Sequence, residues 1–97
     1  MGRKPVPEIL FRVRWPDASV QRCYSPSTVV EEVFAPGDSY PVAEFADRSR
    51  AALTRASERV RRIHGFGCAR AAAQLADIEA RAKSFADGRV VIEGFEP

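Results

Sequence analysis

RASERVRRIHGFGC, residues 55–68, marks the point where one helix of this chain ends and a second begins. Helices commonly end at a glycine with left-handed backbone, followed by an apolar residue that folds back onto the helix. Gly65 and Phe66 suit these two positions. Arg61 and Arg62 precede them, where positive charge meets the negative end of the helix dipole. The stretch therefore predicts a helical hairpin with its turn near residues 64–67.

Apolar residues on both sides of this turn recur at spacings of three and four, which indicates two amphipathic helices. The first starts near Pro41, a residue suited to a first helical turn. Its apolar face comprises Val42, Phe45, Ala46, Ser49, Leu53, Ala56, Val60 and Ile63. The second runs from about Cys68 to Phe85, and its face comprises Ala71, Leu75, Ile78, Ala82 and Phe85. An Asp-Gly pair at 87–88 ends it.

Strands are predicted on both sides of the helices. EILFRVRW, residues 8–15, alternates Ile9, Phe11, Val13 and Trp15 on one face with Leu10, Arg12 and Arg14 on the other. That period of two is typical of a strand with one buried face. After the turn-forming PDAS, VQRCYS completes an antiparallel hairpin over residues 8–25. RVVIEGF, residues 89–95, predicts a last strand, with Val90 and Ile92 opposing Val91, Glu93 and Phe95.

SPSTVVEEVF, residues 25–34, predicts a single helical turn or a loop. Ser27 or Thr28 can cap such a turn, and Glu31 lies where a capping-box partner is found. APGD at 35–38 ends it, because proline and glycine interrupt helices.

The predicted order is β-β-α-α-β, and the fold class is α+β. We expect a small antiparallel or mixed sheet with the helical hairpin packed on one face, two layers around one core. Residues 1–7 contain two prolines without a periodic pattern and are predicted to be a flexible arm. Residues 8–97 are predicted to be a single domain, because 97 residues suffice for one.

Composition limits the classes of function. The net charge is +2, concentrated in residues 41–71, which contain seven arginines against three acidic side chains. The sequence lacks an apolar run of membrane-spanning length and a signal-peptide pattern, so we expect a cytoplasmic protein without membrane contact. Cys23 and Cys68 are then reduced thiols. Two cysteines and one histidine are too few for a recognisable zinc site, so we expect neither metal nor cofactor.

Cys68 and His64 are the candidates for a catalytic site. A cysteine at a helix start can have a lowered pKa, and a neighbouring histidine would make it a nucleophile. The alternative is structural: His64 lies at a helix end, where it can donate to a free carbonyl. Cys68 is then a small buried residue at a tight turn. We favour the structural interpretation, because no third residue that would orient the histidine is evident.

The arginines of the first helix suggest a binding surface. Arg48, Arg55, Arg59 and Arg62 lie on a face other than the apolar one. Glu44–Arg48 and Glu58–Arg62 are favourable i,i+4 pairs that would neutralise part of the row. Three interpretations stay open, in this order: a solvated face, a docking surface for an acidic protein, and a nucleic-acid groove. The last is third because the net charge is small and no nucleic-acid motif is present.

Seven motifs together resemble a family of small bacterial nitrogen starvation response proteins, encoded in gene clusters beside a nitrilase. They are FRVRWPD, RCYSPS, APGDSYPVAEF, RSRAAL, ASERVRRIHGFGC, QLADIEA and VVIEGF, and the resemblance runs from about Ile9 to Phe95. The resemblance implies a setting of nitrogen limitation, with nitriles or cyanide as nitrogen sources. It supplies no catalytic residue. It suggests a shared surface formed by Trp15, Tyr24, Tyr40, Arg48, Arg50 and Arg59, although Trp15 and Tyr40 could equally be packing residues. With Arg55 of the arginine face, these residues make up the predicted binding surface.

We therefore expect a non-enzymatic accessory or adaptor protein that binds another protein of the nitrilase gene cluster, through a sheet edge or the arginine face. A homodimer would support so small a core. One alternative is a small enzyme or redox-sensitive protein that uses Cys68 with His64. Another is a weak binder of anionic ligands or nucleic acid through the basic first helix.

Overall fold

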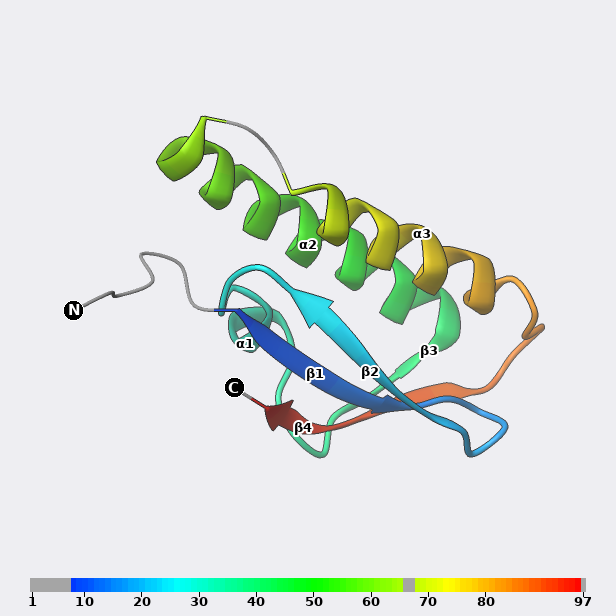
Figure 1. Ribbon diagram of the computed structural model, residues 1–97. Coiled ribbons are helices and arrows are strands. Elements are labelled where there is room, and N and C mark those ends of the chain that lie inside the picture. Colours follow the sequence, from blue (N-terminus) through cyan, green and yellow to red (C-terminus); the bar gives the residue numbers. More distant parts are fainter. Residues whose placement is uncertain (1–7, 66–67, 97) are drawn as a thin grey trace.

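The computed structural model describes residues 8–65 and 68–96, which fold into one four-stranded antiparallel sheet with helices on one side (Figure 1). The strands are β1 (Ile9–Arg14), β2 (Val20–Ser25), β3 (Ser39–Pro41) and β4 (Arg89–Glu96). The helices are α1 (Val30–Val33), α2 (Val42–His64) and α3 (Ala69–Ala82). The strand order is β2-β1-β4-β3. The predicted α+β class and helical hairpin are confirmed.

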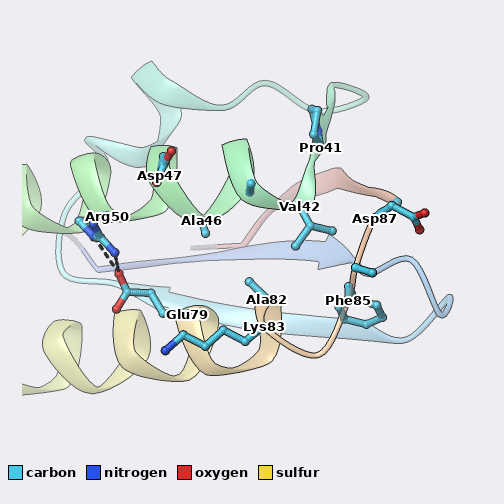
Figure 2. Close-up of a pocket in the computed structure, with 13 residues that line it drawn as sticks. Pro41, Val42, Ala46, Asp47, Arg50, Glu79, Ala82, Lys83, Phe85 and Asp87 are labelled. Carbon is cyan, nitrogen blue, oxygen red and sulfur yellow. Dashed lines mark hydrogen bonds and ion pairs between the residues drawn. The ribbon is translucent and has the colours of Figure 1, made fainter.

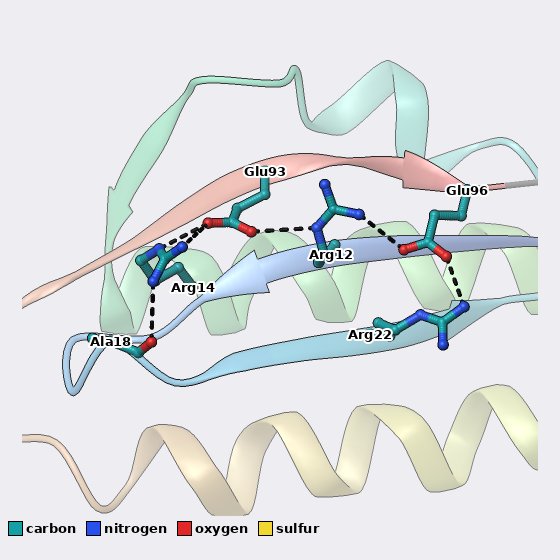
Figure 3. A network of polar contacts seen from close by, with 6 residues as sticks. All are labelled: Arg12, Arg14, Ala18, Arg22, Glu93 and Glu96. Carbon is teal, nitrogen blue, oxygen red and sulfur yellow. Dashed lines mark hydrogen bonds and ion pairs between the residues drawn. The ribbon is translucent and has the colours of Figure 1, made fainter.

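The alternation of β1 places its apolar residues against the helices, as predicted. Phe11 and Val13 are fully buried, and Val90 and Ile92 of β4 are buried beside them. The core is completed by side chains from the helices and connections, chiefly Phe34, Phe45, Leu53 and Ile78. Arg12 and Arg14 lie on the other face of the sheet (Figure 3), which none of the described helices covers (Figure 1).

β3 was missed from the sequence, because a three-residue strand that ends in proline has no alternation to detect. Tyr40 lies opposite Val90 of β4. The Gly37 N–H donates to the Ile92 carbonyl (2.8 Å), and Gly37 has a φ of +91°, which glycine adopts readily. The predicted break at residues 35–38 is therefore also the point where a fourth strand joins the sheet.

A β-bulge in β4 corrects the predicted face of Phe95. Arg12 pairs with Gly94 and Val13 with Ile92, so Glu93 is an extra residue in β4. A bulge shifts the alternation by one residue. Phe95 consequently lies opposite Phe11 and packs against the core, instead of sharing the outer face with Glu93.

The predicted left-handed glycine at the end of the first long helix is confirmed at Gly65, but the two helices differ in length from the prediction. Gly65 has a φ of +83° and its N–H donates to the Arg61 carbonyl (2.7 Å); the predicted anchor Phe66 lies outside the described residues. α3 ends at Ala82, one turn before the predicted Phe85. The Cys68 N–H, at the start of α3, donates to the Ser57 hydroxyl within α2 (3.2 Å). The remaining residues of α2 therefore extend past the start of α3 (Figure 1).

This extension, residues 58–64, is called here the α2 overhang. It projects past the N-terminal end of α3, so α3 does not fully cover its apolar side chains. Val60 is half-buried and Ile63 is 45% exposed, although both were predicted to belong to the buried face. The apolar pattern of α2 therefore continues past the end of the core.

α1 is the single turn predicted at residues 25–34, but its cap differs. Its N-cap is Val29, which makes no side-chain cap hydrogen bond. The Ser27 hydroxyl instead accepts the Val29 N–H (3.1 Å), and the Ser25 hydroxyl donates to the Ser27 carbonyl (2.6 Å). The two serines stabilise the turn before α1, in place of the predicted cap and capping box.

Candidate binding surface

The arginine row of α2 is Arg48, Arg55, Arg59 and Arg62. Their separations of seven, four and three residues place them on one side of a helix with 3.6 residues per turn. Arg55, Arg59 and Arg62 are exposed and Arg48 is half-buried, and the row runs beside the buried face to which Ala52 and Ala56 belong. The predicted arginine face is therefore present, and its members differ in what they contact.

Arg48 is held at the start of α2. Its Nε donates to the Glu44 carboxylate (2.8 Å), the predicted i,i+4 pair, which raises the arginine pKa. Its guanidinium lies 4.5 Å from the centre of the Tyr40 ring. Tyr40 is largely buried, and its hydroxyl donates to Asp38 (3.1 Å). Burial first, and the Asp38 hydrogen bond next, raise the tyrosine pKa. The Tyr40 ring thus packs against the Arg48 guanidinium and helps to hold it in place.

Arg55 reaches across to α1. Its guanidinium lies 3.0 Å from the Glu32 carboxylate, and both side chains are more than half exposed. Arg55 and Glu32 line a hollow of about 420 Å³ between α1 and the end of α2. We call it the arginine hollow; its lining is Val29, Glu32, Thr54, Arg55, Glu58, Arg59 and Arg62.

Arg59 and Arg62 are the free members of the row. Within the part of the chain that the structure describes, neither guanidinium forms an ion pair or a side-chain hydrogen bond. The predicted Glu58–Arg62 pair is not formed between these described residues. Both arginines lie in the α2 overhang, where exposed Ile63 adds apolar surface. This end of the row therefore has unused positive charge beside an apolar side chain.

Arg50 lies on the opposite side of α2 and faces α3. Its Nε donates to the Glu79 carboxylate (2.7 Å) across the mouth of a second groove, of about 540 Å³ (Figure 2). Val42, Ala46, Ala82 and Phe85 form the apolar part of that groove. Arg50 is thus separated from the other predicted surface residues, and its charge is already paired.

Trp15 lies in the core instead of on a surface. It is 1% exposed and packs edge-on against Phe45 and parallel to Phe85. Its indole N–H donates to the Gln21 side chain (2.9 Å). The packing interpretation of Trp15 therefore holds, and this residue does not belong to the binding surface.

Tyr24 is also buried, at the edge of the sheet. Its N–H donates to the Gln74 side chain (2.9 Å) and its hydroxyl to the Glu8 carboxylate (3.1 Å). The Arg70 guanidinium lies 4.0 Å from its ring centre. Burial first, then Glu8 and the neighbouring Cys68, raise the tyrosine pKa. Because Gln74 of α3 takes an outward amide of β2, this edge is partly closed to strand addition.

Cys68 is half-buried at the N-cap of α3. Its predicted partner His64 is the last residue of α2, and the structure does not describe the His64 side chain. Cys23 is a core residue, and burial raises its thiol pKa to about 12. Among the described residues, no group of three or more His, Cys, Asp or Glu side chains could hold a metal ion. No described helix is both long and apolar enough to cross a membrane.

The open face of the sheet has an ion-pair chain that sequence reasoning did not find. Arg14, Glu93, Arg12, Glu96 and Arg22 follow one another across three strands (Figure 3). Successive contacts are 2.7, 3.3, 3.0 and 2.6 Å. The Arg22 hydrogen bond first, and Arg12 next, lower the Glu96 pKa. The available signal was the pair of outward arginines on β1, but the bulge that places both glutamates on the same face is not visible in the sequence.

Fold and surface together define a small two-layer α+β protein with a basic ridge on its longest helix. Residues 10–95 match the family model described as "Nitrogen starvation-induced protein NitG". The chain belongs to this nitrogen starvation-induced family, as the motif resemblance predicted. No curated protein and no solved structure matched the chain. The link to a nitrilase gene cluster stays a prediction.

Proposed function

We propose that this chain is a non-enzymatic accessory protein of the nitrogen starvation response that acts by binding another protein. The observation that supports this is the free end of the arginine row. Arg59 and Arg62 have no partner among the described residues and lie next to the exposed Ile63. Basic and apolar groups side by side are typical of protein docking surfaces, where arginine is enriched. The motif resemblance suggests that the partner is an enzyme encoded in the same nitrilase cluster.

The sheet edges are weaker candidates for the docking surface. β3 has three residues and ends in proline, which cannot donate to a further strand. The outward Tyr24 amide of β2 is taken by Gln74. The arginine row is therefore the proposed docking surface. The predicted homodimer and the Cys68–His64 alternative stay predictions.

The test is affinity purification of the tagged chain from its own host, grown with and without nitrogen limitation. Mass spectrometry identifies what co-purifies, and the intensity ratio gives its stoichiometry. One enzyme of the nitrilase cluster, recovered in near-equal amount with this chain, supports the accessory role. Recovery of the chain without such an enzyme under both conditions overturns it.

A further inference from the structure

We infer that the arginine hollow is the docking site of an acidic protein segment, and that Glu32 competes with that segment for Arg55. This inference rests on the proposed function and specifies the chemistry of the partner. The hollow lies between α1 and the end of α2, with Val29 buried on one side and the arginine row on the other. Its volume of about 420 Å³ can hold several side chains.

The contact between Glu32 and Arg55 shows how a carboxylate binds this row. The two side chains are 3.0 Å apart, with exposed fractions of 56% for Arg55 and 60% for Glu32. Exposed ion pairs contribute little to stability, because water solvates both charges when the pair separates. A carboxylate of a partner can therefore replace Glu32 at small cost. The same segment would pair its other carboxylates with Arg59 and Arg62, which need not be released from any described partner.

The hollow suits a protein better than a nucleic acid. Glu32 and Glu58 line it together with the three arginines, and their carboxylates would repel the closely spaced phosphates of a nucleic acid. An acidic peptide can avoid them, because its charges are separated by neutral residues. Ile63, 45% exposed at the same end of α2, offers contact to an apolar side chain of the peptide.

The experiment is fluorescence anisotropy with a fluorescein-labelled peptide composed of glutamate and leucine. The purified full chain is titrated at low and at physiological ionic strength. Arg59→Glu and Arg62→Glu are each expected to weaken binding about tenfold or more, because each replaces an attractive charge by a repulsive one. Glu32→Gln is expected to tighten binding about two- to fivefold, because it releases Arg55.

Two matched variants control for net charge. Arg61→Glu makes the same charge reversal on the same helical turn. Because Arg61 is two residues from Arg59, its side chain points to another side of the helix. It should weaken binding less than about twofold, by long-range charge alone. Glu31→Gln is the control for Glu32→Gln and should leave binding unchanged. Far-UV circular dichroism confirms that each variant folds.

Equal losses in Arg61→Glu and Arg59→Glu would overturn the inference, because binding would then depend on net charge alone. Absence of peptide binding by the wild type at low salt would do so as well. A labelled DNA duplex that binds more tightly than the peptide would assign the row to nucleic acid instead. If the enzyme purified from the host still binds Arg59→Glu/Arg62→Glu, the accessory role stands, but the arginine row is not its docking surface and the inference about the arginine hollow is wrong.

Discussion

Ile78 and Ile63 make a matched pair of isoleucines that tests where the core ends. Both lie on the apolar faces predicted from the sequence, but Ile78 is fully buried and Ile63 is 45% exposed. Ile78→Ala removes about three carbon atoms, at ~0.8 kcal/mol each, and leaves a cavity. We expect a loss of about 3 kcal/mol in the free energy of unfolding. For a domain of this size, that lowers the Tm by about 12 °C or more.

Ile63→Ala should cost less than about 1 kcal/mol, because half of the side chain already meets water and alanine favours the helix by a few tenths of a kcal/mol. Urea unfolding followed by far-UV circular dichroism measures both variants. The midpoints should differ strongly, with similar slopes. If Ile63→Ala destabilises as much as Ile78→Ala, the α2 overhang is covered in solution, and the exposed end of the docking surface does not exist.

Three other positions give checkable outcomes. Ser49→Ala should leave stability unchanged or raise it by up to about 1 kcal/mol in urea unfolding, because the buried Ser49 hydroxyl has no hydrogen-bond partner among the residues that the structure describes; a clear loss would reveal an unseen partner. Gly88→Ala should destabilise by about 2 kcal/mol or more in the same assay, since Gly88 has a φ of +102° and a Cβ there would lie 2.7 Å from Pro16; an unaffected midpoint would contradict the turn geometry. Iodoacetamide at about pH 8 should label native Cys68 well before Cys23, whose thiol is buried and stays protonated until the pH approaches its raised pKa of about 12. Equal labelling would contradict this burial, and Cys68 labelling faster than a free thiol would favour the alternative that pairs it with His64.

Local patterns predicted much of the fold. The alternation in β1 identified the buried face, and Gly65 identified the end of α2, because each signal depends on neighbours in the sequence. The bulge at Glu93 could not be predicted, since it depends on the register between β4 and β1. β3 was missed for a similar reason: three residues make a strand only when β4 is beside them.

The candidate site was also predicted only in part, because local spacing is visible in the sequence and tertiary contacts are not. Helical spacing alone placed Arg55 and Arg59 on one face of α2. Spacing could not show that Arg55 is paired with Glu32, 23 residues away, while Arg59 has no partner in the described chain. The family resemblance, in turn, grouped Arg50 with these arginines, although Arg50 faces Glu79 of α3. Which charges are free depends on tertiary contacts, and those were not visible in the sequence.

The position of β4 in the sheet has a consequence for synthesis on the ribosome. The last strand of the chain lies between β1 and β3, so neither can complete its pairing until residues 89–96 have emerged. Bringing β4 to β1 closes a loop that contains most of the chain, which is entropically costly and slow compared with local contacts. The α2–α3 hairpin, in contrast, is local and can form first. The β1–β2 hairpin of the nascent chain would therefore keep one edge of β1 exposed until residues 89–96 have emerged, a state that is prone to aggregation.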